Sequence, residues 1–215
     1  MADLKALIIL MKMRMKKMNN RRGELFVVTG PSGVGKATVL GRLMDNVEDV
    51  CISISATTRK PREGEIHGKH YFFIDRAEFE KRIGEDRFLE HAEYVGNYYG
   101  TPADFVEQML EEGKDVILEI EAQGALKVKE KRPDCIMLFI IPPSFSDLET
   151  RLKGRGTESD EVIAKRLETA KKEFEYIDHY DYIVVNDDVD KAADEIRCII
   201  HTSRYKTEKR KHLVR

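Results

Sequence analysis

The sequence predicts an α/β fold in which helices cover both faces of a mostly parallel, five-stranded core sheet. Short apolar runs alternate along the chain with segments of helical periodicity, and a glycine-rich turn separates the first run from the first helix. Strands buried in a parallel sheet read as continuous apolar runs, whereas strands with one wet face alternate. The 215 residues, 41% of them hydrophobic, are enough for one domain with a sizeable core.

Five apolar runs of strand length are the expected core strands. Turn-forming residues bound most of them, as is usual for buried strands. A basic, turn-rich segment and two extended runs interrupt the series after the second strand, which predicts a mixed insertion at that point. The expected strands span residues 24–29, 51–55, 115–121, 135–143 and 181–187, and the extended runs lie within 87–100 around a turn at Gly96-Asn97.

Helical periodicity and capping residues mark the segments between the strands. A Ser or Asp followed three residues later by Glu is typical of a capping box, and Thr-Pro is typical of an N-cap followed by the first helical position. The capping pairs are Asp75 with Glu78, Thr101 with Pro102, and Ser146 with Glu149, and further helices are expected at about 36–46, at 160–178 and from about residue 189.

Charge and cysteine content exclude several classes of protein. The net charge of −2 predicts no nucleic-acid partner. Cys51, Cys135 and Cys198 are odd in number, far apart and each within an apolar run, which predicts buried free thiols in a reducing compartment. The apolar run 4–11 is too short to span a bilayer, and its basic charges follow it, unlike those of a signal peptide. We therefore expect a cytoplasmic protein without membrane attachment.

The two ends of the chain are expected to lie outside the folded domain. Residues 1–22 form a basic N-terminal extension, and residues 206–215 form a basic tail. A membrane or RNA anchor is the alternative reading of the first segment. An upstream start is also open, because four methionines follow in the same segment, at Met11, Met13, Met15 and Met18.

The stretch GPSGVGKAT has the pattern of a phosphate-binding loop between a strand and a helix. Glycines let main-chain N–H groups approach phosphate oxygens, the helix adds its positive dipole end, and Lys36 can reach the β- and γ-phosphates of ATP. An ordinary glycine turn is the alternative interpretation. Ala37 departs from the usual pattern, because it lacks the hydroxyl that contacts Mg²⁺. The residues expected to bind ATP here are Gly30, Pro31, Ser32, Gly33, Val34, Gly35, Lys36, Ala37 and Thr38.

Several further segments carry a resemblance that extends over most of the chain. They read SATTRKPREGE, GKHYFF, FLEHAEYVGNYYGTP, LEIEAQG, IIPPS, LKGRGTE and VNDD, in this order. Together they closely resemble guanylate kinase, a nucleoside monophosphate kinase of purine nucleotide metabolism and GMP recycling, from about residue 23 to 205. The resemblance implies a P-loop kinase fold with a small mixed GMP-binding lobe at about 55–102 and a helical lid at about 144–172. It also implies Mg²⁺-dependent transfer of the ATP γ-phosphoryl group to GMP, and to dGMP, giving ADP and GDP.

The resemblance also implies which side chains bind the acceptor. The planar guanidinium groups of Arg59 and Arg62 can each donate two hydrogen bonds to a phosphate monoester. Tyr71 and Tyr99 can donate their hydroxyls to the same phosphate. Glu90 matches the acid that reads guanine, because one carboxylate can accept from both N1–H and the 2-amino group. Taken singly, each of these residues has a solvated or packing role as its alternative. The expected GMP-binding residues are Ser55, Arg59, Arg62, Tyr71, Glu90, Tyr99, Thr101 and Glu121.

The remaining expected site residues act on the donor and the metal. The family commonly has aspartates where this chain has LEIE, so Glu119, together with Thr38, is expected to hold Mg²⁺ through water. The lid arginines are expected to bracket the phosphoryl group, although a solvated helical face is their alternative interpretation. The full catalytic set expected is Lys36, Arg59, Arg151, Arg155 and Arg166. Asn186 and Asp187 match the segment near the donor base.

Two alternatives to an enzyme of this specificity remain open at this point. One is a guanylate-kinase-like binding module that keeps the fold without catalysis, against which the intact Lys36 argues. The other is a P-loop kinase for another phosphorylated small molecule, against which Glu90 argues. The six histidines are scattered at no ligand spacing, so no histidine metal site is expected. A monomer or a homodimer is expected.

Overall fold

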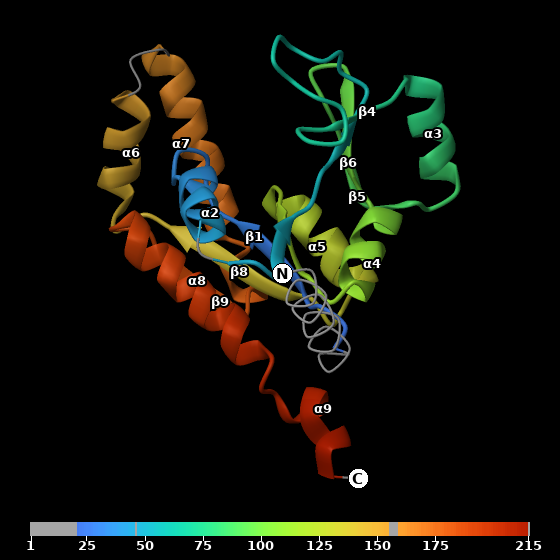
Figure 1. Ribbon diagram of the computed structural model, residues 1–215. Coiled ribbons are helices and arrows are strands. Elements are labelled where there is room, and N and C mark those ends of the chain that lie inside the picture. The colour runs from blue at the N-terminus through green and yellow to red at the C-terminus, as the bar shows by residue number, and fades with distance from the viewer. Residues whose placement is uncertain (1–20, 46, 155–158, 215) are drawn as a thin grey trace, which may run out of the picture.

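A parallel sheet of five strands forms the centre of the computed structural model, which describes residues 21–45, 47–154 and 159–214 (Figure 1). The strand order is β2-β7-β1-β8-β9, and every pairing is parallel. The predicted fold class is therefore confirmed. The strands are β1 (Leu25–Thr29), β2 (Val50–Ile52), β7 (Asp115–Glu119), β8 (Ile136–Ile141) and β9 (Tyr182–Val185).

Helices cover both faces of this sheet. The middle strand β1 supplies both cores, because successive side chains point to opposite faces: Phe26 and Val28 face α2 and α8, whereas Leu25 and Val27 face α4 and α5. All of β1 is buried, which is why its sequence is apolar without interruption. The helices are α2 (Lys36–Met44), α4 (Ala103–Glu111), α5 (Ala122–Lys131) and α8 (Val189–Ser203).

A second, mixed sheet of order β4-β3-β6-β5 stands with α3 on one side of the carboxyl edge of the core sheet (Figure 1). It has its own apolar centre, in which the ring of Phe79 stacks on Phe88 at 4.3 Å and on Tyr98 at 5.2 Å. Its elements are β3 (Ala56–Thr57), β4 (Phe72–Phe73), α3 (Arg76–Gly84), β5 (Phe88–Tyr94) and β6 (Asn97–Pro102).

A helical hairpin rises on the other side of the same edge (Figure 1). Its helices, α6 (Phe145–Lys153) and α7 (Asp160–Phe174), share an apolar cluster of Leu148, Leu152 and Ile163. The hairpin follows β8, just as the second sheet follows β2, so both projections start from carboxyl ends of core strands. The chain closes with η1 (Ile177–His179), α9 (Thr207–Arg210) and η2 (Lys211–Val214).

Two of the predicted helix starts are wrong, one by a single residue and the other by two. Asp75 does cap α3, where its side chain accepts from the Glu78 main-chain N–H at 2.8 Å. Thr101, however, is the last but one residue of β6, and α4 begins only after Pro102. Ser144 caps α6, whereas the predicted cap Ser146 lies inside that helix. Tertiary pairing of β6 therefore overrides the local capping signal of Thr-Pro.

Some strand and helix bounds also differ from those predicted. The run at 51–55 pairs in the core sheet only as far as Ile52, because the chain then crosses to the second sheet. The third run ends as a strand at Glu119, and the long charged helix ends at Phe174 rather than near residue 178. Cys135 is buried and Cys51 half-buried, as expected, but Cys198 is exposed on α8; all three thiols are free.

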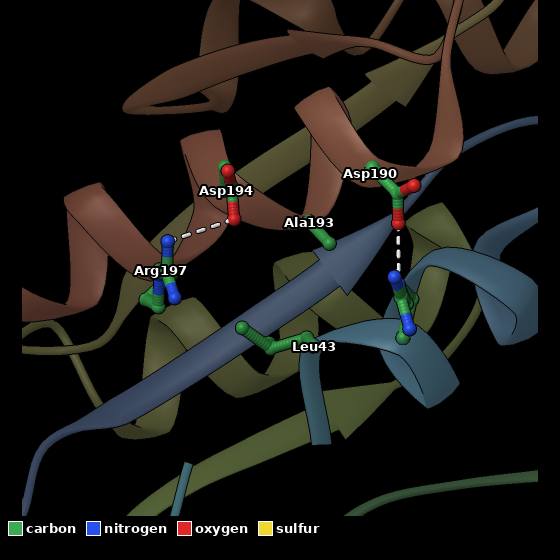
Figure 2. Close-up of a pocket in the computed structure, with 6 residues that line it drawn as sticks. Leu43, Asp190, Ala193, Asp194 and Arg197 are labelled. Carbon is green, nitrogen blue, oxygen red and sulfur yellow. Dashed lines mark hydrogen bonds and ion pairs between the residues drawn. The ribbon is translucent and has the colours of Figure 1, made fainter. Parts of the chain in front are cut away.

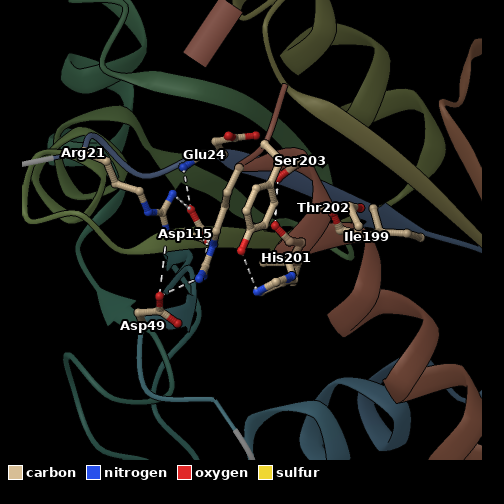
Figure 3. Close-up of polar contacts among 11 residues, drawn as sticks. Arg21, Glu24, Asp49, Asp115, Ile199, His201, Thr202 and Ser203 are labelled. Carbon is tan, nitrogen blue, oxygen red and sulfur yellow. Dashed lines mark hydrogen bonds and ion pairs between the residues drawn. The ribbon is translucent and has the colours of Figure 1, made fainter. Parts of the chain in front are cut away.

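The start of β7 joins the segment before β1 to the end of α8 through a network of polar contacts (Figure 3). The fully buried carboxylate of Asp115 accepts two hydrogen bonds from Arg21, two from Arg204 and one from the Glu24 main-chain N–H. Both arginines also pair with Asp49. This network lies at the amino end of β7, whereas Glu119 ends the strand at the opposite edge.

The outer surface where α2 meets α8 carries ion pairs around a small cavity (Figure 2). Arg42 pairs with Asp190 and with Asp45, and Arg197 pairs with Asp194 at 2.9 Å. These exposed pairs contribute little to stability compared with the buried contacts beneath them. Within the described ranges, none of the helices has the length and apolar character that crossing a membrane requires.

Candidate active site

The phosphate loop joins β1 to α2 and needs its glycines for steric reasons. Gly30, Gly33 and Gly35 all have positive φ, at 148°, 90° and 93°. A Cβ on Gly30 would lie 2.3 Å from the Ile140 main-chain oxygen, and one on Gly35 would lie 2.8 Å from the Asn186 side chain. The glycines therefore allow a loop conformation that side chains would block, and they leave its N–H groups open to an anion.

Two predicted site residues lie against the loop and hold its shape. Asn186 is almost fully buried and donates to the Val34 main-chain oxygen at 2.7 Å. Arg151, from α6, donates to the same oxygen at 3.3 Å and to the Asn186 main-chain oxygen at 2.8 Å. Arg151 thus contacts main-chain oxygens of the loop and of β9's end, so in this conformation it orders the phosphate site.

Lys36 begins α2 and folds back over the loop. Its Nζ donates to the main-chain oxygen of Gly30 at 2.5 Å. Burial lowers the pKa of this amine, while the carboxylates of Glu173, Glu119 and Glu121 act in the opposite direction. An amine held at a carbonyl oxygen of the loop is positioned to move onto phosphate oxygens when they arrive.

Glu173 was not predicted from the sequence as a site residue. It lies in the last turn of α7, where burial raises its pKa, and its Oε2 is buried without a hydrogen-bond partner among the described residues. Arg166, a predicted lid arginine on the same helix, donates to Ser32 Oγ of the phosphate loop at 2.6 Å. A lone glutamate within a long charged helix has no pattern that marks it, so only the packing of α7 on the loop identifies it.

A cavity of about 360 Å³ lies between β5, β6 and the start of α5, a volume typical of small-ligand sites. Five of the eight predicted GMP-binding residues line it: Ser55, Tyr71, Glu90, Tyr99 and Glu121. The rings of Tyr71 and Tyr99 meet edge to face, with centroids 6.1 Å apart. His91, Gly124 and Lys127 also line the cavity, although the sequence did not single them out.

Glu90 is held inside this cavity. Thr101 Oγ1 donates to its Oε1 at 2.7 Å, so the predicted GMP-binding residue Thr101 acts on the carboxylate in this structure. Burial raises the pKa of Glu90, and the Thr101 hydroxyl and the positive charge of Lys127 oppose that rise. A largely desolvated carboxylate gains strongly from donors, which suits a ligand edge that carries two N–H groups.

Arg59 is presented by the loop after β3 and is paired with Glu65. Its guanidinium makes two hydrogen bonds to that carboxylate, at 2.8 and 2.9 Å, and lies 5.4 Å from the ring centre of Tyr71. The pairing lowers the pKa of Glu65 to about 2. Arg62 is exposed on the same loop, and its main-chain N–H donates to Glu65 as well. Glu65 thus fixes the basic loop beside the cavity.

The residues present fit a magnesium ion bound mainly through its nucleotide. Mg²⁺ usually keeps several waters and uses one or two protein carboxylates plus substrate phosphates. Glu119 lies at the end of β7 and is close enough to Lys36 for each to shift the other's pKa. Glu121 was predicted to continue that strand; instead β7 ends at Glu119, and Glu121 is the residue before α5. In the part of the chain that the structure describes, no cluster of three or more acids, histidines or cysteines could hold a metal by itself.

The other predicted residues are placed less centrally. Thr38 and Ala37 are exposed in the first turn of α2. Asp187 is exposed and pairs with Lys191 at 3.6 Å, one residue before the cap of α8. Arg155 lies outside the described residues.

Comparisons with known proteins agree with this arrangement. A family model described as guanylate kinase matches residues 22–203. The chain is 51% identical to a guanylate kinase of Caldanaerobacter subterraneus subsp. tengcongensis over 193 residues, 90% of this chain and 94% of the relative. It is 53% identical to one of Lactococcus lactis subsp. lactis over 188 residues, 87% and 92% of the two chains. The crystal structure of guanylate kinase from Anaplasma phagocytophilum is similar with a TM-score of 0.68 and 35% identity, covering 87% of this chain and 89% of that one. A phosphate loop, a carboxylate-lined cavity and a match across nearly the whole length coincide in one chain, which belongs to the guanylate kinase family.

Proposed function

We propose that this protein transfers the γ-phosphoryl group of ATP to GMP, giving ADP and GDP. The observation that carries the proposal is that one pair of carboxylates borders both halves of the site. Glu119 and Glu121 line the cavity that contains Glu90, and their charges also act on Lys36 of the phosphate loop. An acceptor read by Glu90 and a donor held by Lys36 would therefore meet at this point.

The chain's own residues would act by positioning and by charge. A phosphate monoester is mostly ionised at neutral pH, so the attacking oxygen needs no general base. Lys36 would leave the Gly30 oxygen for the β- and γ-phosphates, and Arg59 with the two tyrosines would orient the acceptor phosphate. Mg²⁺, when bound with ATP, would neutralise phosphate charge, and Glu119 and Thr38 would hold it through water.

The two projections beside the carboxyl edge are proposed to close over the nucleotides. The mixed sheet would carry GMP, and the hairpin of α6 and α7 would act as the lid over ATP. Closure would exclude water, which would otherwise accept the phosphoryl group. Arg151 and Arg166 already connect this hairpin to the loop, through Val34 and Ser32. Turnover of dGMP, a cytoplasmic location and a monomeric or homodimeric state stay predictions from the sequence.

A binding module with the same fold is the second candidate function. The half-buried Lys36, held at the Gly30 oxygen, favours the enzyme, because a module that only binds needs no cation over an ATP loop. A P-loop kinase for another acceptor is the third candidate, and the position of Glu90 in the cavity favours guanine over bases without adjacent N–H groups.

A coupled assay of ADP release separates these candidates. The acceptors are GMP, dGMP, AMP, CMP and UMP, with Lys36→Ala as the inactive comparison and Lys81→Ala, on the surface of α3, as the matched control. We expect turnover with the guanine nucleotides alone and its loss only in Lys36→Ala. Turnover with another acceptor would favour the third candidate, and GMP binding without any ADP release would favour the module.

A further inference from the structure

We propose that Gly124 and Lys127 of α5 position the carboxylate of Glu90 and thereby set the preference for purine monophosphates that carry a 2-amino group. The inference rests on the proposed function, because it concerns the acceptor cavity described above. Neither residue was singled out by the sequence. Both lie on one face of α5, three positions apart, and both line the cavity beside Glu90.

Gly124 leaves the space that the Glu90 carboxylate occupies. A Cβ at this position would lie 3.2 Å from Glu90 Oε2, 3.5 Å from its Cγ and 3.6 Å from its Cδ. The other oxygen, Oε1, is held from the opposite side by Thr101 Oγ1 at 2.7 Å. The carboxylate therefore lies between β6 and α5, and a methyl group on α5 would push it by a few tenths of an ångström, away from its position against Thr101.

Lys127 supplies a positive charge that favours the ionised form of this carboxylate. Its Nζ is 3.4 Å from the main-chain oxygen of His91, the residue after Glu90 on β5. Its positive charge counteracts the burial of Glu90, whereas Glu121, which precedes α5, acts in the opposite direction. The polar and charged groups that act on Glu90 are thus Thr101 from β6, Lys127 from α5 and Glu121 from the turn before α5.

The ionised form matters for one of the two contacts to guanine. A carboxylate can accept from N1–H and from the 2-amino group together, whereas a carboxylic acid presents one oxygen as a donor. Hypoxanthine has the N1–H but no 2-amino group. A displaced or protonated Glu90 therefore weakens the binding of GMP more than the binding of IMP. The ratio of the two affinities thus shows whether the Glu90 carboxylate is correctly placed and ionised.

The experiment measures binding of GMP and of IMP by calorimetry, and turnover separately, on the full chain. Lys127→Met and Gly124→Ala are compared with wild type, with Lys127→Arg as the conservative variant. Lys81→Met and Gly84→Ala on α3 are the matched controls; a Cβ on Gly84 would meet no atom within 4 Å. Thermal unfolding of every variant verifies that the fold is retained.

We expect Lys127→Met and Gly124→Ala to weaken GMP binding about tenfold, the size of one lost hydrogen bond to a charged group, with IMP binding changed far less. Lys127→Arg and both controls keep the wild-type preference. Loss of the Lys127 charge raises the pKa of Glu90, so in Lys127→Met the weakening of GMP binding on acidification begins at a higher pH than in wild type.

Equal losses for GMP and IMP, or unchanged GMP binding in both variants, overturn the inference. A fall in kcat alone with unchanged binding also overturns it, because it shows a role outside base recognition. Failure of the proposed function has a different signature, namely GMP binding by the wild-type protein without any release of ADP. The binding ratios test the inference in that case as well.

Discussion

Replacing Asp115 by Asn removes one buried charge and tests whether the network at the amino end of β7 supports the fold. The Asp115 carboxylate is fully buried and accepts five hydrogen bonds, of 2.7 to 3.0 Å, from Arg21, Arg204 and the Glu24 main chain. An asparagine has one acceptor oxygen, and its NH₂ group would face arginine donors. Both guanidinium groups would then lose the buried one of their two acidic partners and keep only Asp49, whose side chain is 49% exposed.

The size of the effect follows from the exposure of the partners. Removing one member of a buried ion pair costs about 3 to 5 kcal/mol. The two arginine side chains are 25% and 21% exposed, so water can solvate them in part. We therefore expect the lower end, a loss of about 3 kcal/mol in the free energy of unfolding and a fall in Tm of roughly 6 to 12 °C.

Equilibrium urea denaturation and thermal unfolding of the two proteins measure this loss. Asp190→Asn is the matched control, since that aspartate pairs with Arg42 on the surface and its side chain is 67% exposed. The control is expected to lose less than about 1 kcal/mol. Turnover at a temperature where both variants are folded is expected to be unchanged, because Asp115 lies at the opposite end of β7 from Glu119. A loss for Asp115→Asn no larger than that of the control would refute the reasoning.

Three further predictions concern the site. Gly35→Ala is expected to raise the KM for ATP tenfold or more, roughly the effect of 1 to 3 kcal/mol of strain, because the residue has positive φ and its Cβ would meet Asn186 at 2.8 Å; an unchanged KM would contradict the loop geometry. Glu173→Gln removes an acid that raises the pKa of Lys36, so that pKa falls, and the loss of kcat/KM for ATP as pH rises is expected to begin at lower pH; a pH–rate profile with an unshifted alkaline limb would argue against this contact. Burial raises the pKa of Glu90, so the KM for GMP is expected to rise on acidification at a pH above the one at which an exposed glutamate would titrate, and this pH dependence is expected to disappear in Glu90→Gln. Steady-state kinetics of the wild type and the variant between pH 5 and 7, a range above the ordinary carboxyl pKa of about 4.3, measures the two pH dependences. The same pH dependence in the variant would assign it to another group.

The sheet was largely predictable because strands that are buried on both faces consist of apolar residues. The strand β1 is almost wholly apolar, since helices cover both of its faces, and the turn that follows it has glycines at positive φ, which other residues rarely adopt. The pattern of the phosphate loop also placed Lys36 correctly at the start of α2. These features depend on the local chain and on which of its faces are buried.

Local signals failed where distant segments compete for the same residue. Thr101 with Pro102 has the pattern of a helix start, but pairing of β6 and the bond to Glu90 retain Thr101 in the strand. The run after Cys51 looks like one strand, but only its first part pairs in the core sheet. Hydrophobic periodicity indicates which side chains are buried, but it does not indicate which strand or helix they pack against. Such competition between distant segments therefore cannot be predicted from the sequence.

The sequence by itself determined the α/β class, the phosphate loop and the residues that carry the family resemblance, because these depend on patterns within single segments. Only the tertiary structure decided that the charge of Glu173 on α7 acts on Lys36, and that Gly124 and Lys127 of α5 lie beside Glu90. In each case the two partners come from elements separated in the chain and joined by packing. Contacts of this kind depend on how the helices pack on the sheet, and no residue spacing along the chain predicts them.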